Sequence, residues 1–490
     1  MNQRIAKLGM GLLVCYLALF AMVNYVQVAH APSLNTDPLN TRALVRDFDR
    51  PRGQILSADG VVLAESLPAP EGDRFEFQRV YPTGDLFAHT TGFLNFNFGA
   101  DGAERAFNDD LAGQTTELEF QSVSDLFVDR ERVGDVTLTL RADVQEAARN
   151  ALGQQRGSVA AVDPRTGAVL ALWSFPSFDP NALSTHDQAA ADANRAALDP
   201  ASQQSPIIPA AYRKSFFPGS TFKVVTGAIG VEGFGVTDAQ PAYPSEEEFD
   251  IDFTEDELSN FGGSTCGGAL FDILRVSCNS AFAHMGVETI GEAGMIEGAE
   301  RFGFNERPPF DLPAAATSTF PTDFADDEGN GPLARASIGQ GNVSATPLQM
   351  AMVVGALAGD GAVMVPHVLD RVTDDRGEVV RTFEPSVMTQ AVSPATAATM
   401  REAMVGVVES GSGQAGAIDG FVVGGKTGTA QLGTSPPSSH AWFVAFAGRP
   451  GEPPAVAVAV IVEAQPGVSE VTGGRVAAPI ARAVMEAALG

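Results

Sequence analysis

The sequence predicts an α+β protein with an antiparallel five-stranded sheet flanked by helices. Strand-like apolar segments lie near both ends of residues 155–490, and the region between them has mostly helical apolar spacing. The composition, 44% hydrophobic and 19% charged, is that of a folded chain with a sizeable core. A sheet assembled from two distant segments around a helical insertion is an α+β architecture.

Two strands are expected at the start of this domain, at 158–162 and 168–173, joined by a turn that contains Pro164 and Gly167. Three more are expected near the C-terminus, at 421–430, 441–447 and 455–462, with the loop 433–439 making a hairpin of the first two. The last is continuously apolar, as in a strand covered on both faces. A final helix is expected at 477–489, with Pro479 in its first turn.

The N-terminal region predicts an export segment. Residues 8–28 are uncharged and mostly apolar, and as a helix they extend about 31 Å, enough for a hydrocarbon core of roughly 30 Å. The nearest basic residues precede the run, in the tail 1–7, which places the N-terminus in the cytoplasm. We therefore expect a single-pass signal-anchor in the cell membrane and an extracytoplasmic body. The alternative is a signal peptide cleaved after Ala29-His30-Ala31.

The segment after the anchor divides into a tether and a small module. Residues 29–45 are polar and loop-like. Residues 46–154 alternate short apolar pieces with Gly, Pro and Asp, which predicts a non-catalytic α+β pedestal module, with strands in 50–64 and 136–140 and a helix at 142–152. The three chemical motifs described below all fall in the larger domain, 155–490.

Charge and cysteine content limit the partners. The formal net charge of −29 argues against binding nucleic acid, whose phosphates it repels. The six histidines are scattered and Cys266 and Cys278 lack zinc-site spacing, so no metal and no cofactor are expected. In an oxidising compartment these two cysteines are a possible disulfide, and two free thiols are the equal alternative. The acidic stretch 246–257 is expected to be a solvated loop.

Three short motifs follow one another: Ser220-Thr-Phe-Lys223, Ser277-Cys-Asn279 and Lys426-Thr-Gly-Thr429. In this order, Ser-x-x-Lys, Ser-x-Asn and Lys-Thr-Gly are typical of a serine acyl-transfer site. Only four of the 31 basic residues are lysines, and two of the four lie in these motifs. Lysine can lose its proton when it is desolvated and arginine effectively cannot, which suits a site that needs a neutral amine.

The residue types suggest how such a site works. Ser220 is expected at a helix start, where free N–H groups stabilise an oxyanion, with Lys223 one turn further on the same face. To act as the base at pH 7, Lys223 needs a pKa roughly 3 units below the usual value of about 10.4, and burial with a second cation can supply this. Without the other two motifs, Ser220-Thr-Phe-Lys223 has a purely structural explanation: a serine that caps a helix and a lysine on its solvated face.

The other two motifs have similar double explanations. The Ser277 hydroxyl can pass a proton to a leaving amine, and the Asn279 amide can hold a carbonyl, although both residues also suit turns and caps. Lys426 and the Thr427 and Thr429 hydroxyls can bind a carboxylate, and Gly428 can let substrate lie along the strand, although a glycine bulge at a strand end is the simpler explanation.

Two other patterns are set aside. Residues 411–416 match Gly-x-Gly-x-x-Gly but follow an expected helix at 397–408 rather than a strand, so they predict a flexible loop and not a dinucleotide site. A Ser220–His440 hydrolase pair lacks the Gly-x-Ser-x-Gly elbow, and His440 is expected in the hairpin loop.

With these motifs in view, the chain resembles the class B, monofunctional penicillin-binding proteins of the actinobacterial penicillin-binding protein A type. The resemblance covers nearly the whole length and includes, besides the three motifs, Arg52-Gly-Gln-Ile55, Val162-Asp-Pro-Arg-Thr-Gly167, Ser337-Ile-Gly-Gln-Gly341 and His440-Ala-Trp-Phe443. It implies the serine β-lactamase/transpeptidase-like fold and a pedestal related to a dimerisation module.

The resemblance also implies an activity: a peptidoglycan D,D-transpeptidase that is inhibited by β-lactams and acts on the D-Ala-D-Ala ends of stem peptides. Ser220 would be the nucleophile, Lys223 its base, Ser277 and Asn279 the proton shuttle and a substrate contact. Lys426, Thr427 and Thr429 would bind the terminal carboxylate, and N–H groups of Ser220 and Thr429 would form the oxyanion hole.

Alternatives on the same site are a D,D-carboxypeptidase or β-lactamase and a non-catalytic β-lactam sensor. The module before residue 155 is too short for a glycosyltransferase, so a membrane glycan polymerase of the elongation or division machinery is the expected partner.

Overall fold

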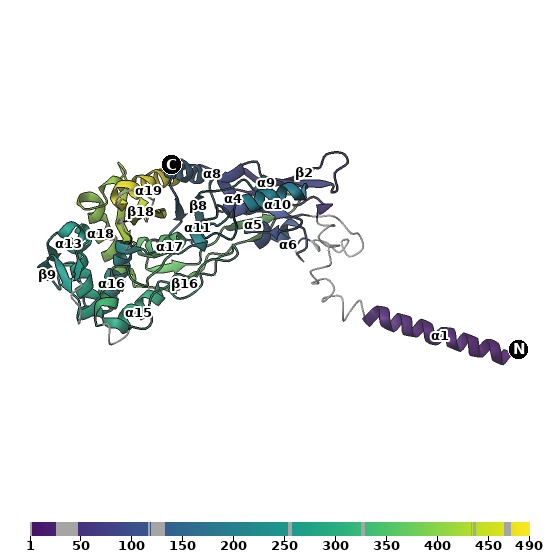
Figure 1. The fold of residues 1–490 in the computed structure, drawn as a ribbon, viewed down its shortest axis with the longest axis horizontal. Helices are drawn as coiled ribbons and strands as arrows, with labels where there is room; N and C mark the ends of the chain where they lie inside the picture. Colours follow the sequence, from purple (N-terminus) through teal and green to yellow (C-terminus); the bar gives the residue numbers. More distant parts are fainter. Residues whose placement is uncertain are drawn as a thin grey trace.

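The structure is a computed structural model of the chain. It describes residues 2–25, 48–115, 118, 133–252, 257–324, 329–432, 434, 438–464 and 472–490. The body is elongated, with one sheet toward each end, and α1 (Asn2–Tyr25) projects from it as a separate helix (Figure 1).

The expected five-stranded antiparallel sheet is present. Its spatial order is β17-β18-β19-β7-β8, and every neighbouring pair is antiparallel. The strands are Gly157–Val162 (β7), Val169–Phe175 (β8), Val422–Gln431 (β17), Ser439–Gly448 (β18) and Val456–Val462 (β19). Every residue of the apolar strand β19 is buried, because strands and helices cover it on all sides. The α+β fold class is therefore confirmed.

Helices flank this sheet as expected. The hydrophobic helix α17 (Pro347–Ala358) packs on β19 and β7, and α19 (Gly473–Leu489) packs on β18 and β19 across the sheet from it (Figure 1). Because α19 begins four residues earlier than expected, Pro479 lies in its second turn and not in its first. Helix α8 (Ala142–Leu152) matches its expected bounds, but it packs against α19 and β8 and so covers the five-stranded sheet.

The second sheet shows an error in the expected organisation. Its order is β15-β14-β6-β1-β2-β3, so a hairpin of β14 (Leu369–Thr373) and β15 (Val379–Thr382) extends the sheet of the N-terminal module. The other strands are Ile55–Leu56 (β1), Val62–Pro68 (β2), Phe77–Val80 (β3) and Asp135–Leu138 (β6). The sequence predicted mostly helix here, because these strands are short and their partner lies more than 200 positions away, as in the pair Val372 and Val136.

A buried ion cluster stabilises this sheet. Glu104 is fully buried and accepts hydrogen bonds from Arg52 Nε at 2.8 Å and from Arg79 Nε at 2.6 Å. The two guanidinium groups hold the pKa of the Glu104 carboxyl low against the opposing effect of burial. Arg52 thus belongs to the module's interior.

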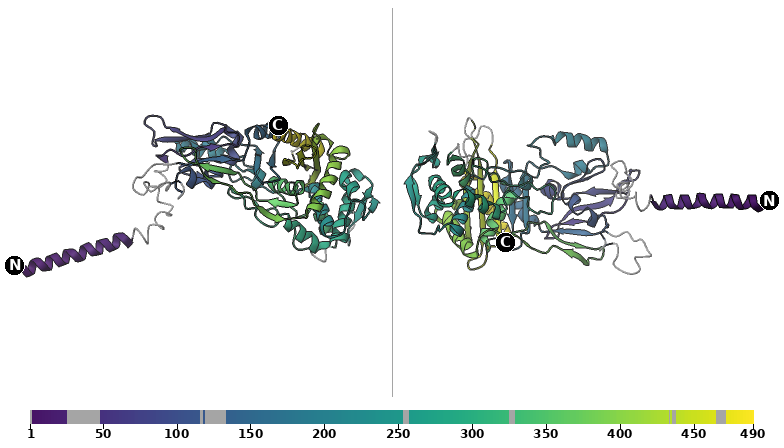
Figure 2. Two further views of the ribbon diagram at one scale, coloured as in Figure 1. Left: turned by 180° about the vertical axis from the view of Figure 1, so that it is seen from behind. Right: turned by 90° about the horizontal axis from the view of Figure 1, so that it is seen from below.

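The remaining elements surround the two sheets, as the two views of Figure 2 show. They include two small strand pairs, 243–246 with 266–268 and 248–250 with 257–259, so part of the loop expected at 246–257 is strand. These elements are α4 (Ala88–Thr91), β4 (Leu94–Asn95), β5 (Gly99–Ala100), α5 (Gly102–Ala106), α6 (Asn108–Leu111), α9 (Pro180–Ser184), α10 (Gln188–Ala197), α11 (Ala210–Arg213), β9 (Tyr243–Glu246), β10 (Glu248–Asp250), β11 (Glu257–Ser259), β12 (Cys266–Gly268), α15 (Gly291–Arg301), α16 (Gly331–Ser337), β13 (Ala362–Met364), β16 (Val387–Gln390) and α18 (Pro394–Ser410).

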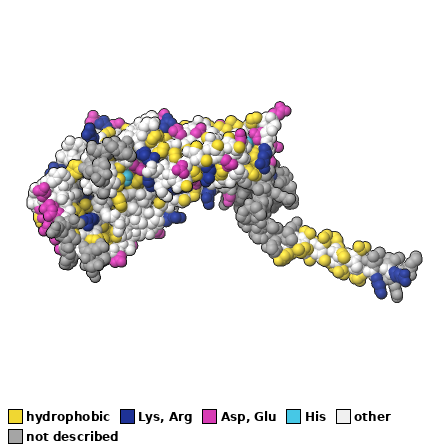
Figure 3. Space-filling model, viewed as in Figure 1, with side chains coloured by type: hydrophobic (Ala, Val, Ile, Leu, Met, Phe, Trp, Pro, Cys, Tyr) yellow, Lys and Arg dark blue, Asp and Glu magenta, His cyan; other side chains and the backbone are white. Residues whose placement is uncertain are grey.

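The expected anchor falls largely within α1. In Figure 3 hydrophobic side chains cover most of the described surface of this helix. Within the residues that the structure describes, no helix combines the length and the apolar character needed to span a membrane. The anchor at 8–28 is therefore not confirmed, and the expected tether at 29–45 lies outside the described residues.

Candidate active site

Ser220 lies in a tight turn that runs into a helix. Residues Gly219–Phe222 form a 3₁₀ turn and α12 (Lys223–Gly233) continues it, so the α-helix begins three residues later than the motif suggested. Gly219 has a φ of +52°, and a Cβ there would lie 3.1 Å from Ala430 Cα of strand β17. Its N–H donates to the Gly339 carbonyl at 2.9 Å. The turn is thus held between β17 and the segment that follows α16.

The Lys223 side chain is completely buried and points into the second motif. Its Nζ donates to Asn279 Oδ1 at 2.6 Å and to the Ser277 carbonyl at 2.8 Å, and it lies 3.4 Å from Ser277 Oγ. The hydrophobic helix α12 makes this burial possible, because its first eight residues are all buried. The first two motifs therefore meet through Lys223.

Ser277 is held in an uncommon backbone conformation. It follows α13 (Leu270–Val276) and precedes α14 (Asn279–His284), with φ 63° and ψ 43°, in the left-handed region that non-glycine residues seldom occupy. Its Oγ accepts a hydrogen bond from Lys426 Nζ at 2.8 Å. Lys426 also donates to the Thr427 carbonyl at 2.9 Å. The third motif thus joins the first two at one hydroxyl.

Burial changes the proton affinity of both lysines. It lowers the pKa of Lys223 well below the usual lysine value, and the nearby Lys426 cation lowers it further. Burial also lowers the pKa of Lys426 to about 7. The two causes expected for Lys223, desolvation and a second cation, are the ones that operate here.

Strand β17 places its alternate side chains on two sides. Thr427, Thr429 and Gln431 line the cavity described below, as alternation along a strand requires. The position of Gly428 faces the other way: a Cβ there would lie 2.9 Å from Thr221 Cγ2 and 3.0 Å from the Pro218 carbonyl oxygen. The glycine therefore lets β17 pack against the Ser220 turn, and the expectation that it clears a path for substrate stays a prediction.

The Asn279 side chain is engaged at both ends. Its Oδ1 accepts from Lys223, and its Nδ2 donates to the Ser259 carbonyl at 2.8 Å. Asn260, a buried residue not singled out from the sequence, caps α14 by accepting from the N–H groups of Asn279 at 2.7 Å and Ser280 at 3.0 Å. The segment around Ser259 therefore orients the second motif, and no short motif marks it.

Cys266 and Cys278 form a disulfide in the structure, with their Cα atoms 5.8 Å apart. Cys278 stands between Ser277 and Asn279, so the bridge ties strand β12 to the second motif. His440, expected in a hairpin loop, lies in β18 opposite Ala430. Its Nδ1 accepts the Ala464 N–H at 3.0 Å, and burial lowers its pKa to about 4, so it has a structural contact in place of a role beside Ser220.

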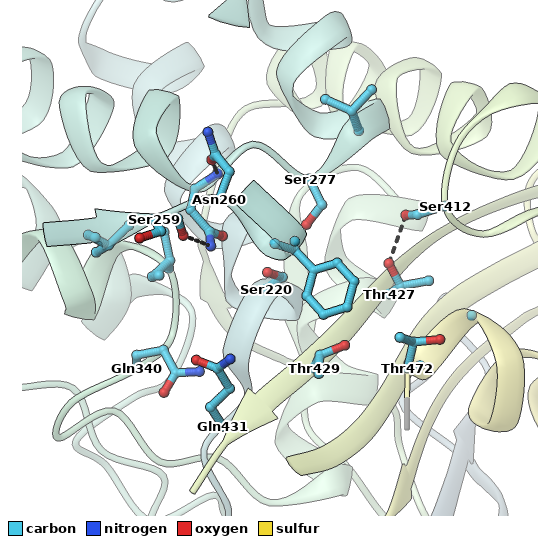
Figure 4. A pocket seen from close by; sticks show the side chains of 18 of the residues that line it. Ser220, Ser259, Asn260, Ser277, Gln340, Ser412, Thr427, Thr429, Gln431 and Thr472 are labelled. Atoms are coloured by element: carbon cyan, nitrogen blue, oxygen red, sulfur yellow. Dashed lines mark hydrogen bonds between the residues drawn. The ribbon is translucent and has the colours of Figure 1, made fainter. Parts of the chain in front are cut away.

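The three motifs open onto one cavity of about 840 Å³. Figure 4 shows Ser220 and Ser277 on one side of it and Thr427 and Thr429 on the other. Residues that the sequence did not assign to the site complete its wall; they include Asn260, Phe261, Arg335, Gln340, Ser412, Gln431, Thr472 and Arg475. Their segments are remote in sequence, so only folding brings them together. In the described part of the chain no cluster of three or more His, Cys, Asp or Glu could hold a metal.

A serine at a tight turn, a buried lysine of lowered pKa three residues further on and a second buried lysine on an edge strand define the class of active-site-serine acyltransferases. Family models give the more specific assignment. Residues 157–486 match the penicillin binding protein transpeptidase domain, and residues 52–136 match the penicillin binding protein A dimerisation domain. The chain belongs to the penicillin-binding protein family and has the domains of its class B, monofunctional members.

Individual relatives agree with this assignment. The chain is 38% identical to the peptidoglycan D,D-transpeptidase PbpA of Mycolicibacterium smegmatis, over 100% of this chain and 99% of that protein. It is 36% identical to PbpA of Mycobacterium tuberculosis, over 100% and 99%. Among solved structures, penicillin-binding protein A of M. tuberculosis as a penicillin G acyl-enzyme complex superposes with a TM-score of 0.80 at 34% identity and covers 90% of this chain and 100% of that one.

Proposed function

We propose that the protein is a peptidoglycan D,D-transpeptidase that cross-links stem peptides through an acyl-enzyme on Ser220. The observation that carries the proposal is the contact of both buried lysines with Ser277 beside the Ser220 turn. A neutral Lys223 accepts the Ser220 proton as Ser220 Oγ attacks the carbonyl between the two terminal D-Ala residues. The N–H groups of Ser220 and Thr429 stabilise the oxyanion.

The acyl-enzyme then forms by loss of the terminal D-Ala. Its amine leaves with a proton delivered through the Ser277 hydroxyl, which Lys223 and Lys426 both contact. The substrate carboxylate binds Lys426, Thr427 and Thr429, and Asn279 contacts the peptide. An amine of a second stem attacks the ester carbonyl, Ser220 leaves, and the cross-link is complete. A β-lactam enters the same first step and stays attached.

Product analysis tests this function. Purified protein is incubated with a D-Ala-D-Ala stem peptide, with and without an amine acceptor, and the products are identified by mass spectrometry. We expect an amide product that depends on the acceptor, and a penicillin adduct on Ser220 that the Ser220→Ala variant lacks. Hydrolysis alone, whatever the acceptor concentration, would instead establish a D,D-carboxypeptidase or β-lactamase. An adduct without turnover of either kind would establish a β-lactam sensor.

We further propose that the N-terminal apolar run keeps the body at the outer face of the cell membrane, near a membrane glycan polymerase. The large apolar side chains of α1 are exposed, among them Leu13, Leu17 and Phe20, and such a surface favours contact with lipid. Carbonate extraction and protease access on spheroplasts test this proposal. Sequencing that finds Pro32 as the native N-terminus would establish cleavage instead.

A further inference from the structure

The loop 411–416, which carries the Gly-x-Gly-x-x-Gly pattern, is packed tightly beside the active site. A Cβ on Gly411 would lie 2.5 Å from the Arg275 carbonyl oxygen, and one on Gly416 would lie 2.7 Å from the Phe443 ring. A Cβ on Gly413 would also contact Phe443, at 3.2 Å. The three glycines therefore meet protein and not open space, which corrects the expectation of a merely flexible loop.

This packing fixes the position of Ser412. Its N–H donates to the carbonyl of Arg275, a residue of α13, the helix that ends at Ser277. On the other side, a Cβ on Gly474 would lie 2.4 Å from the Ser412 carbonyl oxygen, so the start of α19 also touches the loop. Ser412 is thus held between helix α13, which leads into the second motif, and helix α19, which follows the sheet.

The Ser412 side chain faces the third motif. Its Oγ lies 2.7 Å from Thr427 Oγ1, and both residues line the cavity that contains Ser220 (Figure 4). A hydroxyl must donate its proton to a carboxylate in order to bind it, and a second hydroxyl that donates to the first fixes that direction and strengthens both bonds. Among the described residues, the Thr427 hydroxyl makes no other side-chain hydrogen bond.

We propose that Ser412 is a positioning residue for carboxylate recognition: its O–H donates to Thr427 Oγ1, so that the Thr427 proton points at the terminal carboxylate of the donor. This inference rests on the proposed function and extends it, because it explains selection for a free carboxylate by a residue outside the three motifs. The acylation step itself is unchanged. Ser412 acts before it, on the binding and orientation of the donor.

The test compares two probes on the wild type and on Ser412→Ala: benzylpenicillin, which has a free carboxylate, and its methyl ester, which has none. The rate of Ser220 acylation is followed by intact mass. We expect Ser412→Ala to lower the rate with benzylpenicillin about tenfold, as for one lost hydrogen bond, and to leave the rate with the ester nearly unchanged. Ser412→Thr, which retains a hydroxyl, should restore the preference for the free acid.

Two further variants complete the design. Ser410→Ala changes an exposed position two residues away, whose Oγ donates a hydrogen bond to the Gly406 carbonyl of its own helix; this variant is the matched control and should behave as wild type. When Ser412→Ala is added to Thr427→Val, the acylation rate with benzylpenicillin should not fall further, because the Thr427 hydroxyl that Ser412 orients is already absent. An equal loss of acylation rate with benzylpenicillin and with its methyl ester would overturn the inference, because a packing role of Ser412 would affect both probes alike. A wild type that no penicillin acylates would instead refute the proposed function.

Discussion

Lys223 and Lys426 meet at one side chain: Ser277 Oγ lies 3.4 Å from the Nζ of Lys223 and 2.8 Å from that of Lys426. Both lysines are fully buried, and burial together with the Lys426 cation lowers the pKa of Lys223. In the free protein this favours the neutral form of Lys223, which is able to accept a proton. When a donor carboxylate binds Lys426, its negative charge pairs with the Lys426 cation. Substrate binding and the charge state of the site are therefore linked.

The two lysines should respond differently to arginine. Lys223→Arg introduces a group that stays protonated, so acylation by penicillin should fall by orders of magnitude at every pH. Because the pKa of Lys426 is about 7, kcat/KM for acylation should decline in the wild type as pH rises through 7 and this amine loses its proton. Lys426→Arg retains its charge and should show measurable acylation without that decline. Stopped-flow acylation between pH 6 and 9 measures both effects, and equal small losses in the two variants would mean that Lys223 is not the base.

Gly428→Ala should damage the site by displacing the Ser220 turn. Its Cβ would lie within about 3 Å of Thr221, the Pro218 carbonyl and Trp442, atoms that cannot easily move apart. We expect acylation to fall at least tenfold and thermal stability to fall. The control is Gly406→Ala in helix α18, where a Cβ meets nothing within 4 Å and alanine should stabilise by up to about 1 kcal/mol. Melting curves and acylation rates of the two variants decide this, and wild-type acylation by Gly428→Ala would contradict it.

Removal of the disulfide should weaken both the fold and the site. The Cys266–Cys278 bridge closes a loop of sequence separation 12, for which chain entropy predicts roughly 3 kcal/mol of stabilisation. The double variant Cys266→Ser/Cys278→Ser should therefore unfold at lower urea concentration and acylate more slowly, since Cys278 adjoins Ser277 and Asn279. Cys15→Ser, at an exposed free cysteine, is the control. A reductant should shift the wild-type transition but not that of the double variant; the same shift in both would contradict the prediction.

Asp311 should give the stability a specific pH dependence. Burial raises its pKa to about 6, although its carboxylate accepts the N–H groups of Val368 and Leu369. Since the folded value lies above the unfolded one, the folded state binds the extra proton between about pH 4 and 6. Its stabilising effect is complete below this window and is lost as pH rises through 6. Relative to Asp311→Asn, the wild type should lose roughly 3 kcal/mol of unfolding free energy between pH 4 and 7.

Urea unfolding at a series of pH values measures this difference. The control is Asp370→Asn, a nearby, half-exposed residue of β14, whose pH dependence should follow the wild type. A constant difference between the wild type and Asp311→Asn across the range would show that Asp311 does not take up the proton.

Much of this molecule could be predicted from local pattern. The five strands of the catalytic sheet were predicted to within two residues at each end, because each contains an apolar segment and lies next to turn residues; Val456–Val462, which is apolar and buried throughout, is the clearest case. The motif residues Ser220, Lys223, Ser277 and Lys426 were predicted because the spacing of their functional groups can be read directly from the sequence.

Tertiary structure decided what depends on contacts between distant segments. The β14–β15 hairpin joins the N-terminal sheet through pairs such as Val372 with Val136, and no local pattern encodes that partner. The direction of Gly428 and the contact of Ser412 with Thr427 depend on how strands and loops pack. The sequence by itself determined which groups can react. Only the fold decided that both lysines are buried against the same hydroxyl, because desolvation is a property of the surroundings and not of the residue.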